Sequence, residues 1–132
     1  MRDSQKFDPL SAFRLDEKRA LVTGAGRGIG LAIAQSLAAV GAHVTLAART
    51  ASEIGKAASD IKAIGLKADA MSMDIADIER TSKFFENNAP YDVLINNAGT
   101  NCPGPCVEMS VEDYDTVFDL SLIHISEPTR PY

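Results

Sequence analysis

A glycine-rich turn between a short apolar run and an amphipathic stretch is the feature that most constrains the fold of this chain. The turn reads TGAGRGIG over residues 23–30 and directly follows the apolar run RALVT at 19–23. From there on, apolar side chains recur at helical spacing, at Ile29, Ile33, Leu37 and Val40. A strand, a glycine turn and a helix in this order predict the first unit of an α/β fold.

The glycines of this turn are expected to have three different roles. Gly24 allows a tight turn, Gly28 lets a pyrophosphate come close to the backbone, and Gly30 lets the helix pack against the sheet. The helix N-terminus adds free N–H groups and a partial positive charge. A purely structural turn is the alternative, but the flanking strand and helix are what a dinucleotide-binding turn requires.

Strand and helix patterns alternate along the rest of the chain. Further strands are expected at 43–48, 67–74 and 91–97, and further helices at 51–65, 75–88 and 110–120. This alternation predicts βαβ units, a parallel sheet and right-handed crossovers. Phe84 and Phe85 are expected in the core of this domain, which spans residues 19–119 after a polar lead-in at 1–18.

The composition favours a globular domain and disfavours several classes of partner. Hydrophobic residues make up 45% of the chain, enough for a packed core, and the net charge of −5 disfavours nucleic acid. The chain begins without an apolar h-region and has no apolar run of about 20 residues, so no membrane span and a cytoplasmic location are expected. Cys102 and Cys106 are expected as free thiols without a metal, because no histidine is near them in sequence.

Three motifs at strand ends resemble those of the short-chain dehydrogenase/reductase family. The glycine turn has the spacing T-G-x-x-x-G-x-G, NNAG at 96–99 ends the fourth expected strand, and Asp74 follows the third. The resemblance covers residues 14–119, the first half of a typical member, and implies an incomplete Rossmann-type doubly wound sheet with strand order 3-2-1-4. It also implies an oxidoreductase that transfers a hydride between a nicotinamide cofactor and a carbonyl or alcohol substrate. Within the family, residues 13–50 resemble gluconate 5-dehydrogenases and 3-oxoacyl-acyl carrier protein reductases.

The end of the second expected strand indicates which nicotinamide cofactor is bound. An NAD enzyme usually has an acid there, about 20 residues past the glycines, that accepts hydrogen bonds from the ribose hydroxyls. Ala48 stands in that place, Arg49 follows it, and Arg27 adds a positive charge within the glycine turn. Guanidinium groups bind a 2′-phosphate that a carboxylate would repel, so NADP is expected rather than NAD. The alternative is that Arg49 is a solvated residue opening the next turn.

The resemblance implies a set of cofactor-binding residues at the strand ends. These are Thr23, Gly24, Arg27, Gly28, Ile29, Gly30, Arg49, Asp74, Ile75, Asn96, Ala98 and Gly99. Asp74 would hold the adenine amino group and can also cap a helix that begins at Ile75. Asn96 would line the cofactor cleft and stabilise the sheet, and Thr23 would tie the turn to neighbouring strands. A small-molecule substrate and a dimer or tetramer are implied for the intact protein.

The catalytic residues of the family are missing from this sequence. Its chemistry needs a tyrosine with a lysine four residues later, a serine and an asparagine, but no Y-x-x-x-K occurs and Ser121 stands where the asparagine would fall. The chain as given is therefore expected to be inactive. A non-catalytic nucleotide-binding half-domain or an inert fragment is the alternative to an enzyme.

The last residues, 120–132, depart from the family pattern directly after Asp119. The segment LSLIHISEPTR can be written in codons that resemble the transposase-end and adapter DNA used to build sequencing libraries. A non-native tail and a gene that continues are therefore expected, and the competing interpretation is a truncated or frameshifted gene product. Sequencing the locus from a library made without transposase adapters separates the two.

Overall fold

A computed structural model describes residues 8–99 together with 110 and 112. Here strands and helices alternate as the sequence predicts, after a short 3-10 helix, η1, at Ser11–Phe13. The strands are β1 (Arg19–Thr23), β2 (His43–Ala48), β3 (Ala68–Ser72) and β4 (Val93–Ile95), and the helices are α1 (Gly28–Ala39), α2 (Ala51–Ala63) and α3 (Ile78–Asn87). Apart from residues 110 and 112, the expected fourth helix, both cysteines and the tail lie outside the described residues.

The four strands form one parallel sheet with the order β3-β2-β1-β4, which confirms the predicted fold class. β1 pairs with β2 along its whole length and with β4 over Ala20–Val22. Both β1 and β2 are almost entirely buried, as expected for parallel strands covered on both faces. Because successive side chains point to opposite faces, Leu21 belongs to one core and Val22 to the other.

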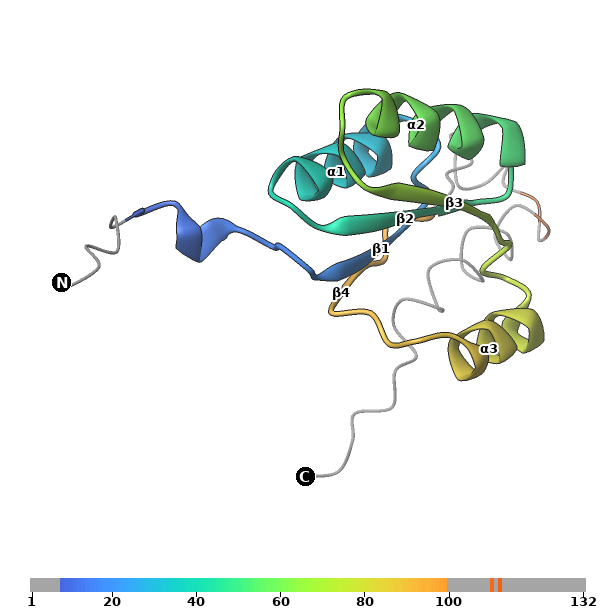
Figure 1. The fold of residues 1–132 in the computed structure, drawn as a ribbon. Coiled ribbons are helices and arrows are strands. Elements are labelled where there is room, and N and C mark those ends of the chain that lie inside the picture. The colour runs from blue at the N-terminus through green and yellow to red at the C-terminus, as the bar shows by residue number, and fades with distance from the viewer. Residues whose placement is uncertain (1–7, 100–109, 111, 113–132) are drawn as a thin grey trace, which may run out of the picture.

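Helices cover both faces of the sheet, with α1 and α2 on one side and α3 on the other (Figure 1). The larger core lies under α1 and α2, where Val44 and Leu46 meet Ile54 and Ile61. The smaller core consists of Leu21, Ala47 and Met73, with Met71, Phe84 and Tyr91 partly buried against it. None of the helices in the described part of the chain has both the length and the apolar character needed to cross a bilayer.

The helix predicted after the glycine turn is confirmed, but it packs through a different face from its apolar stripe. Its buried residues are small, namely Gly30, Ala34 and Ala38. Ile29 is 74% exposed, whereas Ile33 and Leu37 are only partly buried against the core. Small residues at spacings of four let the helix backbone approach the sheet closely, and this closeness leaves the longer side chains at the periphery.

The third helix starts later than predicted, and Asp74 does not cap it. Asp77 is the N-cap, with its Oδ1 accepting from the backbone N of Arg80 at 3.0 Å. Asp74 Oδ1 instead accepts from Ala76 N at 3.0 Å, which forms a turn ahead of the helix. The expectation that Phe85 is in the core is also wrong, since this ring is 43% exposed.

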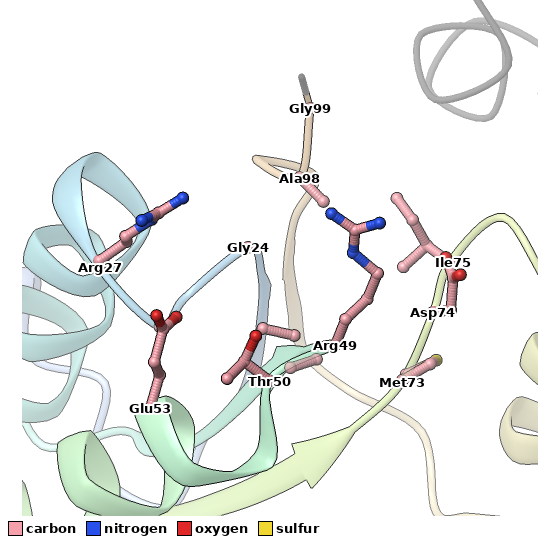
Figure 2. Close-up of a pocket in the computed structure, with 13 residues that line it drawn as sticks. Gly24, Arg27, Arg49, Thr50, Glu53, Met73, Asp74, Ile75, Ala98 and Gly99 are labelled. Carbon is pink, nitrogen blue, oxygen red and sulfur yellow. The ribbon is translucent and has the colours of Figure 1, made fainter. Parts of the chain in front are cut away.

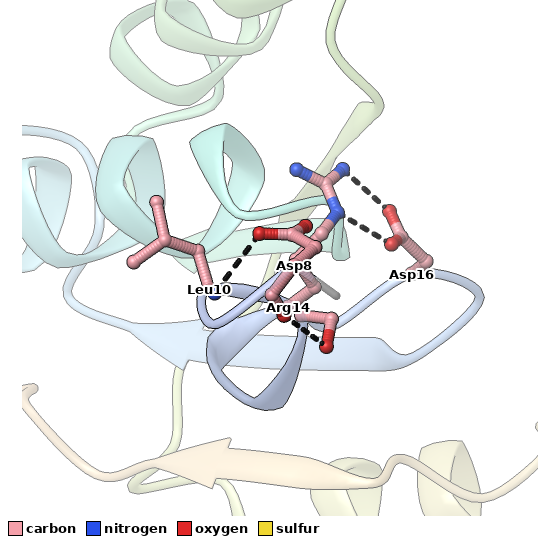
Figure 3. Close-up of polar contacts among 5 residues, drawn as sticks. Asp8, Leu10, Arg14 and Asp16 are labelled. Atoms are coloured by element: carbon pink, nitrogen blue, oxygen red, sulfur yellow. Dashed lines mark hydrogen bonds and ion pairs between the residues drawn. The ribbon is translucent and has the colours of Figure 1, made fainter. Parts of the chain in front are cut away.

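The lead-in before β1 is held by local polar contacts (Figure 3). The guanidinium of Arg14 binds the carboxylate of Asp16 through two hydrogen bonds of 2.6 and 2.7 Å. This pairing lowers the pKa of Asp16 from its ordinary value, chiefly through the hydrogen bond from Arg14. Leu15 N donates to Val40 O at 2.8 Å and its side chain packs against the larger core, so this segment is joined to the end of α1.

Candidate nucleotide-binding site

A cleft of about 180 Å³ opens at the carboxyl ends of the strands. It is lined by Gly24, Gly26, Arg27, Ala47, Ala48, Arg49, Thr50, Glu53, Met73, Asp74, Ile75, Ala98 and Gly99. These residues lie at the carboxyl end of β2 or in the segments that follow β1, β2, β3 and β4 (Figure 2). Because the chain runs from β1 to β2 on one side while β4 pairs on the other, this edge is the topological switch point, where open α/β sheets bind ligands.

The turn between β1 and α1 is held close to the end of β4. Gly24 has φ +63°, and a side chain there would lie 2.9 Å from the Ala98 Cα. A Cβ at Gly30 would lie 2.2 Å from the Gly24 carbonyl oxygen and 2.5 Å from Asn97 Nδ2. Both positions therefore require glycine, one for its backbone conformation and both for the close approach of other groups.

Thr23 and Asn97 join the ends of β1 and β4. The buried Thr23 hydroxyl donates to Ile95 O at 3.3 Å and accepts from the backbone N of Asn97 and of Ala98, each at 3.0 Å. Asn97 Nδ2 donates to the carbonyl oxygens of Thr23 and Gly24 at 3.3 and 3.2 Å. The amide that joins the glycine turn to the end of β4 is thus that of Asn97, which directly follows the Asn96 predicted to stabilise the sheet.

The N-terminus of α1 is open to an anion. The N-cap, Arg27, makes no side-chain capping bond, and the first turn of the helix carries no acidic residue. A side chain at Gly28 would meet nothing within 4 Å, so space is available directly above the helix end. Free N–H groups and the helix dipole make such an end favourable for a phosphate group.

Two guanidinium groups stand at the cleft, as Figure 2 shows for Arg27 and Arg49. Both side chains are exposed, and among residues 8–99 neither is joined to a carboxylate by an ion pair. Arg49 is positioned through its backbone, whose carbonyl accepts from Ser72 Oγ at 3.2 Å. Ala48, at the end of β2, places no carboxylate beside them. The arrangement therefore suits a ligand that carries more than one phosphate group.

The cleft gathers some of the residues predicted from the sequence and omits others. Lining residues among them are Gly24, Arg27, Arg49, Asp74, Ile75, Ala98 and Gly99. Residues that do not line it are Thr23, Gly28, Ile29, Gly30 and Asn96. Of these five, Thr23 and Gly30 are buried and hold the glycine turn against the end of β4. Gly28 begins α1, and the side chains of Ile29 and Asn96 are exposed.

Sequence reasoning missed several residues of the cleft, above all Thr50 and Glu53. Both belong to the start of α2, with Thr50 as its N-cap and Glu53 in its first turn. The predicted helix boundary at residue 51 already placed this turn beside the glycine turn, because both follow neighbouring strands at the same edge of the sheet. The predicted start of this helix is therefore the feature of the sequence that could have identified Thr50 and Glu53 as residues of the cleft.

Comparison with known proteins agrees with this geometry. The family model for short chain dehydrogenase matches residues 18–130. A gluconate 5-dehydrogenase from Gluconobacter oxydans (strain 621H) is 40% identical over 114 residues, which are 83% of this chain and 44% of that protein. An L-xylulose reductase from Mesocricetus auratus is 35% identical over 105 residues, or 80% of this chain and 41% of that protein.

Solved structures show the same similarity in three dimensions. The crystal structure of a gluconate 5-dehydrogenase from Burkholderia cenocepacia J2315, in complex with NADP and tartrate, superposes with a TM-score of 0.79 at 31% identity. The match covers 89% of this chain and 48% of that one. The chain therefore belongs to the short-chain dehydrogenase family. It spans less than half the length of the curated relatives that it matches, and it corresponds to their N-terminal portion.

Proposed function

We propose that the cleft binds NADP and that the whole protein is an NADP-dependent oxidoreductase. The observation that carries this proposal is the pair Ala48 and Arg49 at the end of β2, where a guanidinium faces the cleft and the strand itself ends in alanine instead of an acid. A 2′-phosphate is recognised by a guanidinium fork and repelled by a carboxylate. NADP also accompanies the Burkholderia gluconate 5-dehydrogenase in its crystal structure.

The phosphate groups and the adenine of the cofactor have candidate partners at the cleft. The N-terminus of α1, behind Gly28, would receive the pyrophosphate, and Arg49 with Arg27 would hold the 2′-phosphate. Asp74 and Ile75 would contact the adenine, with the Asp74 carboxylate accepting from its amino group. The other predicted residues, Thr23, Gly24, Ile29, Gly30, Asn96, Ala98 and Gly99, remain part of this proposal.

The reaction belongs to the whole protein. The bound nicotinamide supplies or accepts a hydride, and a carbonyl or alcohol carbon of a small molecule is the reaction partner. The residues described here would bind and orient the cofactor. The relatives named for gluconate and L-xylulose point to sugar acids and ketoses as the first substrates to assay. A dimer or tetramer and a cytoplasmic location complete the proposal.

Replacing Arg49 tests the cofactor assignment. Titration calorimetry on the full chain should show NADP binding more tightly than NAD. Arg49→Gln should weaken NADP binding by roughly 10- to 100-fold, because it removes charge-assisted hydrogen bonds to the 2′-phosphate. NAD binding should change little, since NAD lacks that group.

Arg80→Gln is the matched control, because it removes the same charge from α3, outside the residues that line the cleft. This variant should bind both dinucleotides like the unmodified chain. The proposal fails if NAD binds at least as tightly as NADP, or if Arg49→Gln and Arg80→Gln have equal effects.

A further inference from the structure

Glu53 brings a negative charge to the cleft that Arg27 and Arg49 also line. It extends from the first turn of α2 toward the turn between β1 and α1, on the side of the cleft where Arg27 lies (Figure 2). Its carboxylate lies against the backbone of the glycine turn, since a Cβ at Gly26 would be 2.9 Å from Glu53 Oε2. The side chain therefore contributes directly to the wall of the cleft.

The carboxylate of Glu53 is not neutralised by a salt bridge. Within residues 8–99, no ion pair joins it to Arg27, Arg49 or another cation. The reciprocal capping arrangement that Thr50 and Glu53 could form is incomplete, because the side chain of the N-cap, Thr50, makes no capping bond. An unpaired carboxylate in a cleft with two unpaired guanidinium groups changes the electrostatic potential that a phosphate group meets there.

We infer that Glu53 is a specificity-determining residue, whose charge weakens binding of a 2′-phosphate and so limits the preference for NADP over NAD. This inference rests on the proposed function. The 2′-phosphate is the only group by which the two dinucleotides differ, so repulsion from a carboxylate in the same cleft acts mainly on NADP. The strand end carries alanine at position 48 and thus lacks the acid that usually discriminates. Glu53 supplies a weaker negative charge from the neighbouring helix.

The experiment compares adenosine 2′,5′-bisphosphate with adenosine 5′-monophosphate, because these probes differ only in the 2′-phosphate. Affinities are measured by titration calorimetry with the full chain and with Glu53→Gln at low salt. We expect the ratio of the two affinities to rise by roughly three- to tenfold in Glu53→Gln. The gain should come from the bisphosphate, with little change for the monophosphate. It should shrink in 1 M salt, where the screening length falls to about 3 Å.

Two further variants separate charge from packing. Asp60→Asn removes a carboxylate from the same helix, but Asp60 lies outside the cleft and pairs with Lys56 at 3.6 Å, so the affinity ratio should stay at its unmodified value. Glu53→Asp keeps the charge and shortens the side chain, so it should also leave the ratio near that value. Thermal unfolding of each variant without ligand shows that the fold is retained.

The possible outcomes distinguish this inference from the proposed function. If the unmodified chain binds the bisphosphate no better than the monophosphate, the proposed function fails and the inference falls with it. If the unmodified chain discriminates but Glu53→Gln has the same ratio, the NADP site stands and the role of Glu53 is overturned. A loss of monophosphate binding in Glu53→Gln, or an equal rise in Asp60→Asn, likewise contradicts the inference.

Discussion

Single residues at the turn between β1 and α1 control how closely three segments approach one another. At Gly30, the position of an added Cβ falls 2.2 Å from the carbonyl oxygen of Gly24 and 2.5 Å from Asn97 Nδ2. The first of these atoms belongs to the backbone and cannot rotate away. The helix, the turn and the end of β4 can therefore keep this arrangement only if residue 30 has no side chain.

Gly30→Ala is expected to destabilise the fold by about 1–3 kcal/mol, the usual cost of forcing extra atoms into a packed site. Urea unfolding followed by circular dichroism measures this change. Gly55→Ala is the matched control, because Gly55 lies within α2 and a Cβ there meets nothing within 4 Å. The control should gain roughly 0.5–1 kcal/mol from helix propensity. Equal effects of the two substitutions would contradict the role given to Gly30.

Residues whose role follows from local backbone geometry could be predicted from the sequence. Gly24 and Gly30 were assigned correctly to the tight turn and to close packing, because the strand–turn–helix context fixes both. Asn97 was not identified, because the direction of a side chain after a strand depends on where the strand ends. β4 ends at Ile95, two residues earlier than expected.

At the scale of elements, the pairing of β1 with β4 is reinforced where both strands begin. Asp92 Oδ2 accepts from the backbone N of Arg19 at 2.9 Å, and Lys18 Nζ lies 3.7 Å from the other carboxylate oxygen. The Arg19 guanidinium donates to Ala89 O at 2.6 Å and lies 4.5 Å from the ring centroid of Tyr91. These contacts hold the connection from α3 to β4 against the start of β1.

The contact at Asp92 predicts an acid-dependent loss of stability. The backbone hydrogen bond from Arg19, aided by Lys18, lowers the pKa of Asp92 from its ordinary value. A carboxylate with a lowered pKa in the folded state stabilises the fold above the unfolded-state pKa, and this contribution disappears as the pH falls through the folded-state pKa. The loss is therefore expected below about pH 4.

Asp92→Asn provides the comparison for this prediction. Urea unfolding between pH 7 and pH 3 should show the unmodified chain as the more stable at neutral pH, with the difference between the two narrowing as the pH falls below about 4. Because Asp92 is exposed, salt should reduce the Coulombic part of the difference. A difference that is constant over this pH range would contradict the role of the Asp92 charge.

The limits of sequence prediction at this scale come from competing local signals. β1 and β2 were predicted with the observed bounds, because their apolar runs are short and end at clear turn residues. The predicted start of α3 at residue 75 is wrong. Asp74 and Asp77 are both good capping residues, and tertiary contacts decide between them.

At the scale of the whole molecule, the two faces of the sheet are covered unequally. The side under α1 and α2 contains the larger core, whereas none of the residues of α3 is fully buried. Ile29 on α1 and Leu94 on β4 are 74% and 49% exposed. A periodic apolar pattern predicts that a helix is amphipathic, but the partner that covers each apolar side chain is set by contacts across the whole fold.

The arrangement of the whole sheet brings the cleft together from four separate segments. Its walls follow β1, β2, β3 and β4, so the cleft depends on the strand order more than on any single element. We propose that this edge of the sheet binds the adenosine half of NADP through its 2′-phosphate.

An amide chemical-shift titration of the full chain with NADP tests this claim most directly. We expect saturable shifts concentrated at residues 24–30, 47–53, 73–75 and 97–99, the segments at the carboxyl ends of the strands. The amide shifts around Arg49 should be much weaker with NAD at the same concentration, because NAD lacks the 2′-phosphate. Shifts confined to other surfaces, such as the surface of α1 around Ile29, or identical shifts with NADP and NAD would contradict this proposal.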